Sequence, residues 1–272
     1  MSVEKMRVVA TYTAAAEHFD DACAAFWGYF GRRTVERLAL PEGARVLDVC
    51  CGTGSSALPA AEAVGSKGFV LGLDLTPALL AKAESKAQQR GFAHLQFICA
   101  DFESVSLAQA PFDAVICVLG IFFLPDMAAA LQRLWGWVRP GGALAITTWG
   151  RTVLEPVNRL FWESVREERP DLDRAFRPWD RIATPGDLAG LFEAAGIPHS
   201  HAEAESRAFP VPDANDFWAV VLGSGYRGTP EQMNLASQER LRLRLLEKLR
   251  TAGAGALDME VIYGLARKGR DV

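Results

Sequence analysis

The chain contains 272 residues, of which half are hydrophobic and 23% are charged, and its formal net charge is −4. Such a composition is typical of a globular protein with a sizeable core, and the mildly acidic balance argues against broad, salt-driven binding to nucleic acid. Asp and Gly interrupt the longest apolar runs well below membrane-spanning length, and no basic-then-apolar leader is visible.

Residues 11–40 are expected to form a helix, because apolar side chains recur at helical spacing before Pro41 stops it. From there to residue 150, short apolar strands alternate with helices. The expected strands are 45–52, 68–75, 95–102, 112–120 and 143–150, and the helices between them are 55–65, 77–91 and 126–142. Since these strands are apolar on both faces, they predict a parallel sheet covered by helices on each side.

The rhythm changes after Gly150. Residues 151–180 are rich in Trp and Pro and predict an irregular insert, which is followed by a helix at 187–197, an edge strand at 201–211, an amphipathic helix at 238–250 and a last strand at 259–269. With no repeat and no linker in between, the prediction is one α/β domain over 1–272 with a Rossmann-like, seven-stranded, mostly parallel sheet. Its expected parts are a helical lid (1–40), a ligand-binding core (45–150), a cap (151–235) and a closing helix and strand (236–272).

The segment VLDVCCGTG, residues 46–54, places an acid and a glycine turn directly after the first strand. In open α/β sheets, ligands sit beyond the carboxyl ends of the strands, so this turn is the prime candidate site. Gly52, Gly54 and Ala57 fit the dinucleotide pattern G-x-G-x-x-G/A. S-adenosylmethionine is a second candidate ligand, and a tight turn that binds nothing is the third interpretation.

Acids at the expected ends of three successive strands distinguish between these ligands. Asp48 suits a nearby cationic ammonium and would repel a pyrophosphate. Asp74 lies 20 residues after Gly54, where a carboxylate can accept both hydroxyls of a ribose. Asp101 and Phe102 can bind an exocyclic amine and cover a purine face. Partners for an ammonium, a ribose and an adenine, in that order, favour S-adenosylmethionine over a dinucleotide.

Five segments together resemble the class I S-adenosylmethionine-dependent methyltransferases, near the ubiquinone- and menaquinone-biosynthesis-like small-molecule group: VLDVCCGTG, LGLDLTPALL, ICADFESV, FDAVICVLGIFFLPD and RPGGALAITTW. The resemblance covers about residues 45–150 and implies S-adenosylmethionine as cofactor and an antiparallel last strand. The residues that it implies as cofactor contacts are the methionine-side group (Asp48, Gly52, Thr53, Gly54), the ribose group (Asp74, Leu75), the adenine group (Asp101, Phe102), the end of the fourth strand (Val118, Leu119) and Tyr12 in the lid. The family commonly has glycine where this chain has Cys50.

The expected function is S-adenosylmethionine-dependent methyl transfer to a partly apolar small molecule by in-line displacement. A sulfonium methyl is already electrophilic, so alignment of the reactants is the main requirement, and we expect no metal and no obligatory triad. His18 is a candidate base for an acceptor that keeps its proton until attack. The alternatives are an NAD(P)-dependent oxidoreductase and a non-catalytic S-adenosylmethionine-binding protein. The expected partner is a small-molecule acceptor rather than nucleic acid or a membrane, with the oligomeric state left open.

Several other features have a simpler interpretation. GSGYRG (223–228) fits the glycine pattern but no strand precedes it, so a turn is favoured over a phosphate site. Cys50 and Cys51 have no second pair, which favours packing over metal binding, and the odd total of five cysteines fits a reduced, cytoplasmic setting. The arginines of 238–250 are interpreted as a solvated helix face rather than an RNA or membrane site.

Overall fold

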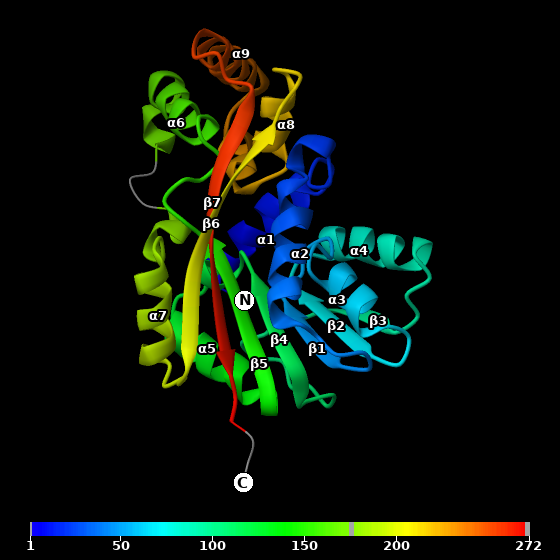
Figure 1. Ribbon diagram of the computed structural model, residues 1–272. Helices are drawn as coiled ribbons and strands as arrows, with labels where there is room; N and C mark the ends of the chain where they lie inside the picture. The colour runs from blue at the N-terminus through cyan, green and yellow to red at the C-terminus, as the bar shows by residue number, and fades with distance from the viewer. Residues whose placement is uncertain (1, 174–176, 270–272) are drawn as a thin grey trace. The chain divides into compact units, whose positions relative to one another are not determined.

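The computed structural model describes residues 2–173 and 177–269 (Figure 1). The chain forms two compact units, each assembled from three segments. The first comprises Met1–Phe26, Thr152–Arg177 and Ser206–Glu260, and is called the helical unit below; the second comprises Trp27–Arg151, Pro178–Glu205 and Val261–Val272, and is called the sheet unit.

The described residues form a seven-stranded sheet in the order β3-β2-β1-β4-β5-β7-β6. Its strands are β1 (Arg45–Val49), β2 (Phe69–Asp74), β3 (Leu95–Cys99), β4 (Phe112–Val118), β5 (Val138–Trp149), β6 (Ser200–Pro210) and β7 (Ala256–Arg267). The strands β3, β2, β1, β4 and β5 pair in parallel, whereas β7 runs antiparallel to β5. The predicted Rossmann-like sheet with an antiparallel last strand is confirmed.

Helices cover both faces of this sheet (Figure 1). One face carries α2 (Phe26–Leu38), α3 (Ala57–Val64) and α4 (Pro77–Gln89), packed on alternate strand residues such as Val46, Val70 and Ile116. The other face carries α5 (Met127–Gly136) and α7 (Pro185–Ala194), packed on Leu47 and its equivalents. Successive strand side chains point to opposite faces, so a strand buried on both sides must be apolar throughout, as this sequence is.

The expected helix over 11–40 is wrong as one continuous element. The structure has α1 (Val3–Ala15), a 3₁₀ turn (Ala22–Ala24) and then α2. Between the helices the backbone closes successive three-residue turns instead, because the N–H groups of His18, Asp21 and Ala24 bond to the carbonyls of Ala15, His18 and Asp21. The fifth strand also begins earlier than expected, at Val138, so the Pro-Gly-Gly segment that was interpreted as a helix stop lies inside β5.

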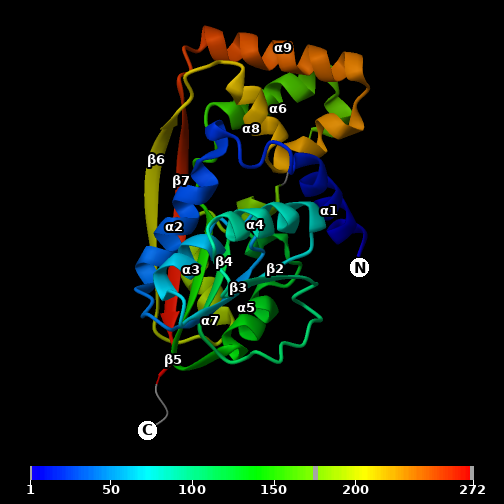
Figure 2. The same cartoon turned by 90° about the vertical axis from the view of Figure 1, so that its right-hand side faces the viewer.

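In the helical unit, α9 (Leu235–Thr251) lies alongside α6 (Val157–Glu168), and α8 (Asp216–Leu222) follows β6 along the chain (Figure 2). Leu241, Leu245 and Leu249 form the fully buried stripe of α9. The basic residues of this helix are largely exposed, as expected for a solvated face, and α6 supplies acidic partners for some of them. The ion pairs between the two helices include Arg240–Glu168, Arg244–Glu167 and Lys248–Glu167. No helix within 2–173 and 177–269 combines the length and the apolar character that crossing a membrane requires.

Candidate functional site

The turn between β1 and α3 uses left-handed backbone at three of five consecutive residues. Cys50, Gly52 and Gly54 have φ values of +59°, +54° and +86°. Glycine adopts this conformation freely, whereas a residue with a Cβ pays about 1–2 kcal/mol. Cys50 therefore occupies a position that suits glycine, which is the residue that the family resemblance places there. The glycines are therefore required by the turn itself.

Asp48 ends up completely buried beneath this turn. Its Oδ2 accepts a hydrogen bond of 2.7 Å from the Ser56 hydroxyl, and its Oδ1 has no hydrogen-bond partner among the described residues. Burial raises the pKa of this carboxyl to about 7, and the bond from Ser56 only partly opposes the rise. A buried carboxylate with a free acceptor atom fits a cationic N–H donor brought by a ligand.

Asp74 ends β2 and holds the turn from the neighbouring strand. Its Oδ2 accepts the backbone N–H of Gly52 at 2.9 Å, and its Oδ1 accepts that of Thr76 at 2.8 Å. Burial raises the pKa of the Asp74 carboxyl, while these bonds act in the opposite direction. A carboxylate offers about four acceptor positions, so both oxygens can still receive hydroxyls. The sequence pointed to Asp74 as a ligand residue but gave no signal for its bond to Gly52.

Asp101 and Phe102 follow β3, and the structure gives them different environments. The Asp101 Oδ1 accepts the backbone N–H of Glu103 at 3.0 Å in a short turn. The Phe102 ring is 4% exposed and packs edge-on to Trp137, and its carbonyl accepts the Arg133 Nε–H at 2.7 Å. The acid is therefore at the strand end, as expected, while the aromatic ring belongs to the core beneath α5.

The end of β4 meets the turn from its other side. Leu119, next to the half-buried Val118, has φ +54° and donates its N–H to the Thr147 carbonyl at 2.8 Å. A Cβ on Gly120 would stand 2.5 Å from the Cβ of Cys50, so the two chain segments are in direct backbone-level contact. The predicted residues Thr53 and Leu75 lie in the same region, the first fully buried and the second half-buried.

The cysteines near the turn serve as packing groups. The Cys51 thiol is buried under Gly72, whose added Cβ would lie 3.0 Å from it. Hydrogen bonding to Cys117 and burial raise the pKa of the Cys50 thiol well above its ordinary value. Such thiols are poor nucleophiles at neutral pH. In the part of the chain that the structure describes, no three His, Cys, Asp or Glu side chains gather as a metal site.

Tyr12 and His18 lie in the helical unit, whereas all the other predicted site residues lie in the sheet unit. The Tyr12 ring contacts Phe19 edge-on at 6.1 Å between centroids. The His18 Nδ1 is 2.8 Å from the Asp21 Oδ2, an arrangement that orients the imidazole. Asp21 was not singled out from the sequence, although an acid three residues from a histidine is a visible spacing.

The second glycine pattern, 223–228, has a packing role in the helical unit. Gly223 ends α8, and a Cβ there would come within 2.8 Å of the carbonyl carbon of His18. A Cβ on Gly228 would collide with the Thr11 side chain. Residues Gly225–Gly228 form a 3₁₀ turn with no strand before it. These glycines allow close approach of α1 and the segment after it, which explains them without a ligand.

Comparison with known proteins places this chain in a family. A family model described as a methyltransferase domain matches residues 46–142. The demethylmenaquinone methyltransferase of Bacillus velezensis is 32% identical over 176 residues, which are 61% of this chain and 76% of that protein. Aklanonic acid methyltransferase DauC of a Streptomyces species is 33% identical over 144 residues, 53% of this chain, and the matched part spans 66% of that relative's length. The solved structure of YcgJ from Bacillus subtilis shares the fold, with a TM-score of 0.59 at 17% identity over 89% of this chain and all of that one.

The chain belongs to the S-adenosylmethionine-dependent methyltransferases. S-adenosylmethionine is accordingly its cofactor, and the site chemistry is compatible with it. The free Oδ1 of buried Asp48 suits the positively charged amino group of that molecule, and the half-buried Gly52 has no Cβ that would hinder a close approach.

Proposed function

We propose that this chain transfers the methyl group of S-adenosylmethionine to a partly apolar small-molecule acceptor by in-line displacement. The observation that carries the proposal is the row of acids Asp48, Asp74 and Asp101 at the carboxyl ends of β1, β2 and β3, which are adjacent parallel strands. Ligands of such sheets bind at this edge. The order of the acids matches an ammonium, a ribose and an adenine amine.

In this proposal the cofactor supplies a methyl group on a sulfonium sulfur, and the protein residues bind and orient the cofactor and the acceptor. Asp48 accepts the ammonium, Asp74 accepts the ribose hydroxyls while fixing Gly52, and Asp101 accepts the adenine amine. Thr53, Leu75, Phe102, Val118 and Leu119 line the same site, largely through their backbone. Holding two reactants in line can supply roughly 7–11 kcal/mol of barrier reduction. Tyr12 as a further cofactor contact and His18 as a base remain predictions.

The acceptor class is taken from the relatives and from the charge distribution. The two relatives above are named for demethylmenaquinone and aklanonic acid, which are both small molecules. The basic residues Arg240, Arg244 and Lys248 of α9 are engaged by acids of α6, so they give no support to a nucleic-acid acceptor. The relatives and the ion pairs of α9 therefore support a small-molecule acceptor rather than nucleic acid or a membrane.

Calorimetric titration with S-adenosylhomocysteine, with NAD(H) in parallel, tests the cofactor assignment. We expect tight binding of the first ligand and a loss of roughly 100-fold or more in Asp74→Ala, because the turn loses its anchor and the ribose its acceptor. Asp113→Ala is the matched control. Asp113 also accepts a backbone N–H, from Arg45 at 2.7 Å, but at the opposite end of β1, so its loss should leave binding within twofold.

Binding of NAD(H) alone would contradict the proposal and favour the oxidoreductase. The transfer step is tested by incubating the protein and S-adenosylmethionine with demethylmenaquinone or aklanonic acid and measuring S-adenosylhomocysteine release. Tight S-adenosylhomocysteine binding without release, also across a wider panel of apolar small molecules, would favour a non-catalytic binding protein.

A further inference from the structure

The turn between β1 and α3, residues 50–56, is called the cofactor turn below. The helix α2 touches this turn through a glycine. A Cβ added to Gly31 would lie 2.5 Å from the carbonyl carbon of Ser55 and 2.9 Å from the Ser56 nitrogen, closer than real contacts allow. Both partners are backbone atoms, which cannot rotate away. Ser56 is also the residue whose hydroxyl binds Asp48. The position of α2 therefore sets where the segment directly after Gly54 can lie.

Polar contacts on two sides of α2 fix it on the sheet. At its buried side, the Thr34 and Thr147 hydroxyls are 2.6 Å apart, and Thr147 belongs to β5. At its outer side, arginine and tyrosine side chains of α2 bind carboxylates of β6. These contacts outnumber the one on the buried side. Trp27 and Phe30 add apolar contact with Trp149, with ring centroids 5.7 and 6.3 Å apart.

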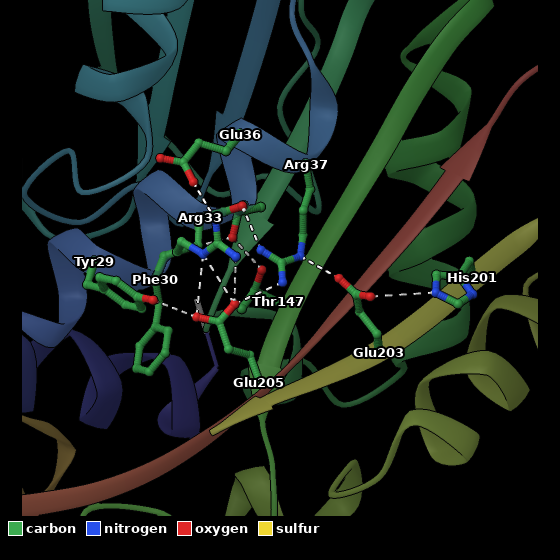
Figure 3. Close-up of polar contacts among 10 residues, drawn as sticks. Tyr29, Phe30, Arg33, Glu36, Arg37, Thr147, His201, Glu203 and Glu205 are labelled. Atoms are coloured by element: carbon green, nitrogen blue, oxygen red, sulfur yellow. Dashed lines mark hydrogen bonds and ion pairs between the residues drawn. The ribbon is translucent and has the colours of Figure 1, made fainter. Parts of the chain in front are cut away.

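The outer attachment converges on one carboxylate, that of Glu205 on β6 (Figure 3). Three side chains of α2 donate to it: Tyr29 Oη at 2.8 Å, Arg33 Nε at 3.2 Å and Arg37 Nη2 at 2.9 Å. The Glu205 side chain is only 17% exposed. Although burial by itself raises the pKa of this carboxyl, the bonds from Arg33, Tyr29 and Arg37 together lower it. Charge-assisted bonds to a sheltered carboxylate are among the stronger polar contacts in proteins.

We propose that Glu205 is a positioning residue for the cofactor turn, which acts through α2 and the contact of Gly31 with Ser55 and Ser56. Glu205 itself touches neither the turn nor Asp48 in this scheme. It holds α2 against the sheet, α2 backs Ser56, and Ser56 orients Asp48. The inference rests on the proposed cofactor site and adds a specific route by which a distant carboxylate sets its geometry.

A glycine pair on α2 tests the contact. Gly31→Ala should weaken S-adenosylhomocysteine binding about tenfold or more, because the turn must shift to admit the methyl group. Gly28→Ala is the matched control on the same helix, since a Cβ there meets nothing within 4 Å. It changes helix propensity equally and should leave the affinity within twofold. Equal affinities for the two variants would overturn the proposed contact.

Glu205→Gln tests the anchor, with Glu62→Gln as its control. Glu62 accepts from Arg32 on another side of α2 at 3.2 Å, with both side chains about half exposed. We expect about fivefold weaker S-adenosylhomocysteine binding for Glu205→Gln, measured well below its unfolding temperature, and no change for Glu62→Gln. A lowered unfolding temperature with unchanged affinity would show a purely structural role and overturn the proposal.

The double variant Gly31→Ala with Glu205→Gln decides the route. If Glu205 acts through the Gly31 contact, the double variant should bind little worse than Gly31→Ala alone, whereas fully additive losses would contradict that route. The wild-type titration separates this inference from the proposed function. Failure of the wild-type protein to bind S-adenosylhomocysteine would overturn both, and wild-type binding with unaffected variants would overturn only the positioning role.

Discussion

The cofactor turn and the contact between α2 and β6 both rely on sheltered carboxylates, but in opposite electrostatic conditions. Asp48 and Asp74 receive hydrogen bonds from neutral groups, and burial raises their pKa. Glu205 is bound by two guanidinium groups, and its pKa is lowered. Glu205 is thus compensated by cations of the chain itself, whereas burial disfavours the ionised forms of Asp48 and Asp74, which a cationic ligand at the proposed site would favour.

The largest expected effect is on the Asp48 side of this comparison. The folded-state pKa of Asp48 is about 7 against an ordinary value of 3.8, so the unfolded chain releases this proton first as pH rises. The apo protein should therefore lose stability between about pH 4 and pH 7, by on the order of 4 kcal/mol. Asp48→Asn removes this loss and should be the more stable protein at pH 8, as measured by urea unfolding.

The same substitution separates stability from binding. Wild-type protein should bind S-adenosylmethionine more tightly as pH rises through about 7 and should release a proton on binding, because the cation favours the ionised carboxyl. Asp48→Asn should bind weakly and without this pH dependence. Calorimetry in buffers of different ionisation enthalpy measures the proton directly. Parallel stability curves and equal proton release for the two proteins would remove Asp48 from the cation-binding role.

A smaller effect of opposite sign is expected for Glu205. Its pKa lies below the ordinary 4.5, so its stabilisation is complete above that value and is lost as pH falls through the folded-state pKa. At pH 7, Glu205→Gln should be less stable than wild type by roughly 1–3 kcal/mol, and the gap should close toward pH 3. The ionisable groups around Glu205 are Tyr29, Arg33, Glu36, Arg37, Glu203 and Tyr263.

Those groups are present in both proteins, so the difference between the two urea-unfolding curves isolates Glu205. A gap that stays constant from pH 7 to pH 3 would mean that the ionised carboxylate contributes no more than the amide. In that case the contrast between Glu205 and the carboxylates of the cofactor turn would be one of location only.

Much of the fold could be predicted because its signals are local. Apolar strands alternating with helices predicted the sheet, and the acids Asp48, Asp74 and Asp101 were placed at strand ends by strand length alone. The break between α1 and α2 was missed, because helical spacing of apolar side chains continues across a segment whose backbone forms three-residue turns.

The positioning contacts around the turn could not be predicted from the sequence, since they join residues far apart in the chain. Glu205 lies 172 residues from Arg33, and no periodicity relates the two. Gly31 looks like any helical glycine, yet its neighbour Gly28 faces open space. The pattern at 223–228 shows the opposite risk, which is that a motif match is mistaken for a ligand site. Its glycines are explained by packing on α1 and His18. Only the strand before the turn at 50–54 distinguishes the two glycine segments.

The smallest effect is expected for carboxylates of the helical unit, which extend the comparison to surface pairs. Glu168 and Glu247 both pair with an arginine at 2.6 Å, but their side chains are 7% and 60% exposed. Glu168→Gln should lower the unfolding temperature by a few degrees, because Arg240 loses its carboxylate partner and Arg244 keeps only Glu167 next to the buried stripe of α9. Glu247→Gln should change it by less than about one degree, since water and salt screen an exposed pair.

Differential scanning calorimetry at low and high salt measures both shifts. Equal shifts for the two variants would show that shelter from solvent does not set the strength of these pairs, and that the Glu205 contacts derive no special strength from it either.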